Sequence, residues 1–120
     1  MKSREIALRC ARRAYAKKAG AVQVLDVSRL TSVCSYFVVV SGRSEVHVKT
    51  IAEAIAKELK KEHIYPLHRE GWNPGQWVLL DYGGVVVHVF KKSVREFYMI
   101  ENLWADARPV NWQKTKKDKK

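Results

Sequence analysis

Residues 77–90 read WVLLDYGGVVVHVF, and this stretch decides the fold of the chain. Two runs of large apolar and β-branched residues flank Gly83 and Gly84, and a Gly-Gly pair can supply the two positive-φ residues of a type I′ turn. The pattern therefore predicts a β-hairpin with a two-residue loop. A three-residue loop is the alternative, and it would shift the pairing by one residue and move His88 to the other face.

The two-residue loop sorts the hairpin residues onto two faces, because directly opposed residues share a face. One face is wholly apolar and contains Val78, Leu80, Val85, Val87 and Val89. The other face is mixed and contains Trp77, Leu79, Asp81, Val86, His88 and Phe90. We expect the apolar face to be core. Two interpretations of the mixed face stay open: it binds a partner, or another helix covers it and makes it core.

Segments before the hairpin predict two helices and three strands. Residues 3–18 carry apolar side chains at helical spacing, with Gly20 suited to end the helix. This Arg-rich segment is like an organellar presequence in composition, but we favour a helix docked on the domain. Residues 44–61 predict the strongest helix, with Ser44 as N-cap. Strands are expected at residues 21–27, at 36–40 in a central position, and at 64–69, where Pro66 indicates an edge.

The remaining elements complete one small domain. A last helix opens at Ser93, and its apolar side contains Val94, Phe97, Tyr98, Glu101 and Trp104. Together the predicted helices and strands form a mixed five-stranded sheet with helices packed on it, which is α/β or α+β by class. The length of 120 residues and the apolar content of 47% suit a single domain, which we place at residues 1–110. Residues 111–120 are expected to be a basic disordered tail that the fold does not need.

The net charge of +11 is concentrated at the two ends. Residues 1–19 hold seven Lys or Arg against one acid, a net +6, and residues 111–120 hold five Lys against one Asp, a net +4. Residues 20–110 contribute only +1, from eleven basic and ten acidic residues. Such ends are either solvated tails or an attraction to nucleic acid phosphates, and both can hold together.

The inventory of reactive residues favours a binding module over an enzyme. Cys10 and Cys34 are 24 positions apart, and the four histidines show no metal-ligand spacing. The strand acids Asp26 and Asp81 form no DxD or DxE pair for divalent metals. We therefore expect no metal or cofactor. With no apolar run long enough for a bilayer and no signal peptide, we expect a cytoplasmic protein without a membrane partner.

The competing enzyme hypothesis rests on Gly42. The turn SGRS at residues 41–44 precedes the predicted helix, and the free N–H groups of a helix N-terminus favour an anion. A nucleotide-binding or transferase enzyme using this turn is the alternative function, although no P-loop motif is present. A third hypothesis is a basic RNA-binding domain without a particular target.

Four segments in order resemble the ribosomal silencing factor family, also called Iojap-related proteins. They are LDVSRLTSVCSYFVVVSGRSEVHVKTIAEAI, PLHREGW, WVLLDYGGVVVHVF and REFYMIENLWADA, and together the likeness covers about residues 4–108. The resemblance implies a nucleotidyltransferase-like fold without the catalytic carboxylates. It also implies a translational repressor that binds the large ribosomal subunit at its protein number fourteen and blocks joining of the small subunit. Free members of the family are often homodimers.

The chain departs from the family pattern at Gly84, where the family usually has Asp, at the basic pair Lys91 and Lys92, and in its Lys-rich end. These basic groups add contacts with ribosomal RNA phosphates to the expected partners. We assign partner binding to the mixed face of the hairpin and to two residues of the neighbouring matched segments. The assigned residues are Trp77, Leu79, Asp81, His88, Phe90, Glu70 and Tyr98.

Overall fold

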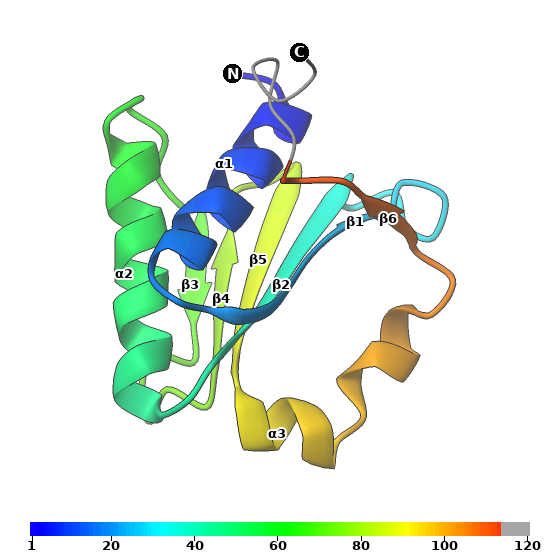
Figure 1. Ribbon diagram of the computed structural model, residues 1–120. Coiled ribbons are helices and arrows are strands. Elements are labelled where there is room, and N and C mark those ends of the chain that lie inside the picture. The colour runs from blue at the N-terminus through cyan, green and yellow to red at the C-terminus, as the bar shows by residue number, and fades with distance from the viewer. Residues whose placement is uncertain (114–120) are drawn as a thin grey trace.

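The computed structural model describes residues 1–113, which form a mixed sheet with helices on both of its faces (Figure 1). Along the chain the elements are α1 Ser3–Ala16, β1 Gly20–Asp26, β2 Tyr36–Gly42, α2 Glu45–Lys60, β3 His68–Glu70, β4 Trp77–Asp81, β5 Val85–Lys91, α3 Lys92–Phe97, the 3-10 helix η1 Ile100–Trp104, and β6 Arg108–Val110. The predicted class, a mixed sheet of α+β type, is confirmed.

Within the described residues the sheet has six strands in the order β3-β4-β5-β2-β1-β6, where five were predicted. The additional strand is β6, which pairs antiparallel with β1 through Val24 and Val110. It escaped prediction because a three-residue strand containing Pro109 has no periodicity of its own. The central pair, β2 and β5, is parallel, and the neighbouring pairs are antiparallel.

Two apolar clusters lie on the two faces of the sheet. Helices α1 and α2 cover the face that contains Val78, Leu80, Val85, Val87 and Val89, all fully buried, so the predicted core face is confirmed. Helix α2 begins after Ser44, whose Oγ accepts a hydrogen bond from His47 N at 3.1 Å, as the sequence predicted. On the other face a smaller cluster gathers Leu25, Val39 and Phe90 around Ile100 and Trp104 of η1.

The hairpin register is the one that the two-residue loop predicts. Trp77 lies opposite Phe90 and Leu79 opposite His88, and Tyr82 N donates to Val85 O at 2.8 Å to close the loop. The predicted type I′ turn is wrong, because only Gly83, with φ +85°, has a positive φ in the loop. A single positive φ at the first loop position is the pattern of a type II′ turn, which matches the strand twist equally well.

Helix α1 is docked on the sheet, as expected, but it ends earlier than predicted. Its last residue is Ala16, and Lys18 rather than Gly20 takes the left-handed conformation with φ +66°. Ala19 N then donates to Ala14 O at 3.1 Å, a bond typical of a helix C-terminus closed by a left-handed residue. Gly20 instead opens β1.

The conformation of Lys18 leads to a stability prediction. A left-handed φ is strained for a residue with a Cβ, whereas glycine adopts it freely. We therefore expect Lys18→Gly to raise the free energy of unfolding by about 0.5 to 1 kcal/mol. Gly20→Ala is the control, because Gly20 lacks a positive φ and an added Cβ would meet no atom within 4 Å. Urea unfolding measures the stability of both variants. A destabilised Lys18→Gly variant would contradict the left-handed conformation assigned to Lys18.

The predicted third strand and the predicted last helix are corrected. Strand β3 is at the sheet edge, as predicted, but covers His68–Glu70 instead of residues 64–69. The predicted last helix is interrupted at Met99, whose φ of +51° separates α3 from η1. Consequently Phe97 and Tyr98 do not share a buried side with Val94 and are exposed.

Among residues 1–113, no helix has both the length and the apolar character needed to cross a membrane.

The predicted disordered tail is corrected at its first residues. Trp112 is half-buried, and its Nε1 donates to Val22 O at 3.2 Å. Its ring lies 5.4 Å from that of Tyr15, and Arg12 Nε donates to its carbonyl at 3.0 Å. The ordered domain therefore extends past residue 110, and the rest of the predicted tail, residues 114–120, lies outside the described part.

Candidate partner-binding surface

The sheet face turned away from α1 and α2, here called the outer face, is half covered and half open. Trp104 of η1 covers the part over β5 and β2, where its ring lies 5.2 Å from Phe37 and 5.1 Å from His88. His88 and Phe90 are thereby buried, with 5% and 0% exposure. Trp77, one strand further toward the edge, is 41% exposed. The mixed face is thus core at its centre and surface at its edge.

His88 is a neutral side chain inside this aromatic group. Burial alone lowers its pKa to about 4, with no charged neighbour to offset it. Its Nδ1 accepts a hydrogen bond from Trp77 Nε1 at 3.2 Å, so the neutral ring carries its proton on Nε2. That Nε2 is buried without a hydrogen-bond partner in the described residues, among the rings of Phe37 and Trp104. His88 fixes the orientation of Trp77.

The prediction that His88 and Phe90 contact a partner is therefore corrected. Both are shielded by η1, and their role is to support Trp77, whose ring lies 4.6 Å from that of Phe90. Residue alternation along a strand determines which face a side chain occupies, but not what covers that face. Trp77 is the member of this group that remains accessible.

The open half of the outer face consists of polar and half-buried residues on β3 and β4. Glu70 lies opposite Leu79, and His68 lies opposite Asp81. Glu70 is exposed and pairs with His68 on the same strand. Asp81 is half-buried, and its Oδ1 accepts a hydrogen bond from Gly83 N at 2.8 Å, so this carboxylate also stabilises the hairpin loop. Glu70, Leu79 and Asp81 thus share one side of the sheet.

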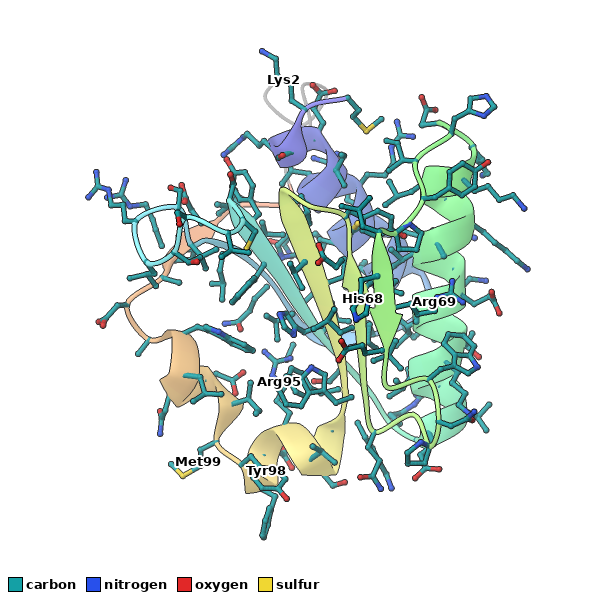
Figure 2. The ribbon with its side chains drawn as sticks, turned by 180° about the vertical axis from the view of Figure 1, so that it is seen from behind. Lys2, His68, Arg69, Arg95, Tyr98 and Met99 are labelled. Carbon is teal, nitrogen blue, oxygen red and sulfur yellow. The ribbon has the colours of Figure 1, made fainter. Side chains whose placement is uncertain are left out.

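Exposed apolar side chains also gather on α3 and η1. Phe97, Tyr98, Met99 and Leu103 are 76%, 65%, 62% and 64% exposed, and Tyr98 and Met99 project from the junction of the two helices (Figure 2). Lys91 N donates to Gln76 O at 2.7 Å, which joins the start of α3 to the residue before Trp77. We call the set Glu70, Trp77, Leu79, Phe97, Tyr98, Met99 and Leu103 the docking surface.

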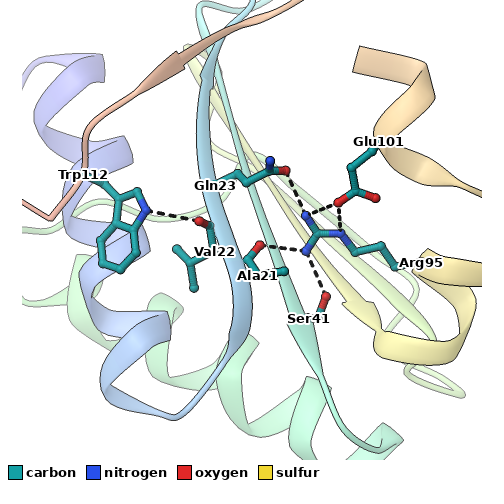
Figure 3. Close-up of polar contacts among 7 residues, drawn as sticks. All are labelled: Ala21, Val22, Gln23, Ser41, Arg95, Glu101 and Trp112. Atoms are coloured by element: carbon teal, nitrogen blue, oxygen red, sulfur yellow. Dashed lines mark hydrogen bonds and ion pairs between the residues drawn. The ribbon is translucent and has the colours of Figure 1, made fainter. Parts of the chain in front are cut away.

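A buried arginine fixes α3 and η1 against the sheet. Arg95 is 3% exposed, and its guanidinium donates to Ala21 O at 2.8 Å, Ser41 Oγ at 2.9 Å and Gln23 Oε1 at 2.9 Å (Figure 3). It also pairs with Glu101 of η1 at 2.6 Å. The sequence alone gives no signal for the role of Arg95, because its partners lie on β1 and β2, far away in the sequence. Arg95 is the residue that positions the cluster.

The whole chain matches a known family. A family model described as "Ribosomal silencing factor during starvation" matches residues 1–120. The chain belongs to this family. A ribosomal silencing factor of Chromobacterium violaceum is 41% identical over 85 residues, 71% of this chain and 70% of that protein. One of Halalkalibacterium halodurans is 38% identical over 94 residues, 78% of this chain and 80% of that protein.

The likeness extends to solved structures. A crystal structure of a Chromobacterium violaceum protein superposes with a TM-score of 0.83 at 33% identity, covering 100% of both chains. The function of this ribosomal silencing factor therefore lies in translation regulation, with the ribosome as its partner.

At the Gly42 turn, a backbone N–H that could bind an anion is bonded within the chain. Arg43 N donates a hydrogen bond to His47 Nδ1 at 2.9 Å. A Cβ on Gly42 would lie 2.8 Å from Val48 N, so close packing on α2 explains the glycine without a ligand. A cavity of about 390 Å³ lies beside the turn, lined by both acidic and basic side chains.

The strand acids are also separated. Asp26 is on β1 and Asp81 on β4, and two strands lie between them in the sheet. Within residues 1–113, no three His, Cys, Asp or Glu side chains are grouped to hold a metal ion. Asp26 instead accepts hydrogen bonds from Ser28 N and Ser28 Oγ, which lower the pKa of its carboxyl.

Proposed function

We propose that this silencing factor is a non-enzymatic translational repressor that binds the large ribosomal subunit through its docking surface. Protein number fourteen of that subunit is the proposed contact, and the bound domain blocks joining of the small subunit. The observation that carries the proposal is the exposure of Phe97, Tyr98, Met99 and Leu103 on α3 and η1, together with that of Trp77 on β4. Aromatic residues and methionine are enriched in protein interfaces, and contiguous exposed apolar residues mark such sites.

The polar members of the docking surface suit a basic ribosomal protein. Glu70 is exposed at the rim and offers a carboxylate to a cationic partner. Rim charges of this kind steer association and set specificity more than they add affinity. Trp77 and Tyr98 are of the residue types that most often dominate binding energy. The Arg95 network holds the apolar cluster in one position, which lowers the entropy cost of binding.

Blocking of subunit joining follows from size. The principal extents of the protein are 38 × 32 × 30 Å. Contacts that bridge two subunits require surfaces to approach within side-chain distance, so a bound body of this thickness holds them apart. No chemistry is needed for this effect. In the free protein the same exposed cluster gives a homodimer a surface to bury, and we include a free homodimer in the proposal.

Co-sedimentation with isolated large subunits tests the docking surface. We expect the double variant Phe97→Ser, Tyr98→Ser to bind about 30-fold more weakly, since an interface hot spot contributes about 2 kcal/mol. Both side chains are exposed, so the thermal stability of the variant should remain close to that of the unmodified chain. The variant should also fail to prevent the association of small and large subunits in a sucrose gradient.

The matched control is Val33→Ser, which removes an apolar side chain of 83% exposure from the connection between β1 and β2. It should bind large subunits as the unmodified chain does. If the double variant still bound large subunits and still blocked joining, the assignment of the docking surface would be wrong. A separate binding measurement with isolated protein number fourteen and the same variants tests whether that protein is the contact.

A further inference from the structure

The cavity of about 390 Å³ beside Gly42 lies at the end of the sheet where strands β2 and β5 end. These two strands are parallel, and the helices that follow them, α2 and α3, begin at this same end (Figure 1). Helix α2 then packs on one face of the sheet, whereas α3 and η1 pack on the other. In open sheets with parallel strands, the crevice at such a point of divergence is the usual place for a small ligand.

The charges around this cavity are not balanced. Its charged lining residues come from two connections and two helices, and they are Lys18, Arg43, Lys92, Arg95, Glu96 and Glu101. Arg95 and Glu101 form an ion pair at 2.6 Å and so neutralise each other. Within residues 1–113, the other four form no ion pair with an oppositely charged side chain. Three positive groups therefore stand against one negative group, a net charge of +2 that the protein itself does not compensate.

The backbone that lines the cavity has an unusual conformation. The pairing of β1 with β2 shifts between Gly20 and Gln23, and Ala21 takes a left-handed φ of +45° there. Its carbonyl accepts a hydrogen bond from Arg95 Nη1 at 2.8 Å (Figure 3). Lys18, with φ +66°, is a second left-handed residue in the lining. Strand irregularities and strained residues of this kind gather beside binding sites, where the required geometry is worth their cost in stability.

We infer that this cavity binds the phosphate group of a small phosphorylated metabolite, a phosphate monoester. Such a group carries a charge of about −1.5 to −2 at pH 7, which complements the net charge of the lining. Lysine and arginine side chains form charge-assisted hydrogen bonds with phosphate oxygens. Because Arg43 N is already bonded to His47, side chains rather than this amide supply the contacts. The volume is within the range of about 300 to 1,000 Å³ typical of small-ligand sites, and leaves room for an organic part.

A terminal phosphate is favoured over a phosphate of an RNA backbone by the shape of the site. On the side of the sheet the cavity is closed by the buried residues Ser41, Gly42 and Arg95. A backbone phosphate has a sugar on each side and carries a single negative charge, so it fits a recess of this kind poorly. A monoester enters such a recess with its phosphate first. RNA is therefore the competing ligand that the experiment has to exclude.

Titration of the isotope-labelled full chain with ribose 5-phosphate, followed by amide NMR spectra, tests the inference. We expect saturable shifts at Ala21, Gly42 and Lys92, with a Kd below about 10 mM. The amides of Lys57 and Lys60, on exposed positions of α2, should not shift. Ribose without a phosphate should cause no shifts, because it lacks the group that the cations bind. Inorganic phosphate should bind more weakly, because it lacks the organic part.

Two pairs of variants test the charge of the cavity in opposite directions. Lys92→Gln should weaken binding about tenfold, since a charge-assisted hydrogen bond is lost. Lys57→Gln removes the same charge from an exposed position outside the cavity and should leave binding unchanged. Glu96→Gln removes the unpaired acid of the lining and should tighten binding several-fold. Glu53→Gln is its control on α2 and should have no effect. The same spectra show whether each variant is folded.

Several results would overturn the inference. They are the absence of saturable shifts up to about 10 mM, equal shifts with ribose alone, and shifts spread over basic residues outside the cavity. Equal weakening in Lys57→Gln and Lys92→Gln would mean that net charge alone attracts the anion. Equal affinity for inorganic phosphate would refute the metabolite as the ligand. If an RNA hairpin shifted the same amides at lower concentration than ribose 5-phosphate, RNA would be the ligand instead.

The cavity does not depend on the proposed docking surface. Phe97 and Tyr98 are exposed and do not line the cavity. The Phe97→Ser, Tyr98→Ser variant should therefore bind ribose 5-phosphate as the unmodified chain does. Its co-sedimentation with large subunits is measured separately, so a failure of either assignment can be told from a failure of the other. Loss of ribose 5-phosphate binding in this folded variant would contradict the location of the phosphate site.

Discussion

Replacement of Arg95 by methionine is expected to lower the free energy of unfolding by about 3 kcal/mol. Methionine fills a similar volume but donates no hydrogen bonds, so Ala21 O, Gln23 Oε1 and Ser41 Oγ lose their donor inside the protein. Removal of one partner from a buried polar network costs roughly 1 to 3 kcal/mol for each group left unsatisfied. The side chain of Glu101 is 52% exposed and can turn to water, which keeps the total near the lower end.

Chemical denaturation measures this loss of stability, and two further variants serve as comparisons. Glu101→Gln keeps the hydrogen-bond acceptor and should cost less than Arg95→Met. Arg29→Met alters an exposed arginine between β1 and β2 and should change stability by less than about 0.5 kcal/mol. Because Arg95 also positions α3 and η1, the Arg95→Met variant should bind large subunits more weakly even where it is fully folded. A variant as stable as the unmodified chain would show that the network contributes no net stability.

The elements that were predicted correctly have strong local periodicity. The register of the hairpin follows from the alternation on both sides of Gly83 and Gly84, and a one-residue shift would have exposed its apolar face. Helix α2 follows from an apolar stripe together with the Ser44 cap. In both cases the residues within a short window favour the same local structure, and the tertiary contacts favour it too.

Arg95 and Trp112 were not predicted because their roles depend on distant partners. Arg95 bonds to residues 54 to 74 positions earlier, and an arginine in a short helix ordinarily indicates solvent. Trp112 is a single aromatic residue in a polar segment, yet it packs on α1, about a hundred residues earlier in the chain. Neither contact produces a periodic pattern in the sequence. For Trp112, its position as a single aromatic residue in a polar segment is the one feature that could have indicated its role.

The candidate site was predicted in part. The sequence assigned Trp77, Leu79 and His88 to one face, and the structure places them there. Which of them is accessible depends on the break at Met99, which lets η1 turn back over β5 and leaves Phe97 and Tyr98 exposed. A left-handed residue that is not glycine has no reliable signature in a single sequence.

Acidification from pH 7 to 4.5 is expected to destabilise the protein by on the order of 2 to 3 kcal/mol through His88 alone. Its pKa is lowered to about 4 in the folded state, from an ordinary value of 6.5 that the unfolded chain retains. Between these two values the unfolded chain binds a proton that the folded chain does not. Stability therefore falls as the pH drops below 6.5 and stops falling, on account of this residue, below about 4.

The variant His88→Gln isolates this contribution. Glutamine can accept the hydrogen bond from Trp77 Nε1 but does not titrate in this range, so unfolding curves of the variant should be nearly flat between pH 7 and 5. Carboxylates titrate mainly below this range, which keeps their contribution small. His63→Gln, at an exposed position, should retain the pH dependence of the unmodified chain. Equal acid sensitivity in the unmodified chain and in His88→Gln would show that another group causes the loss.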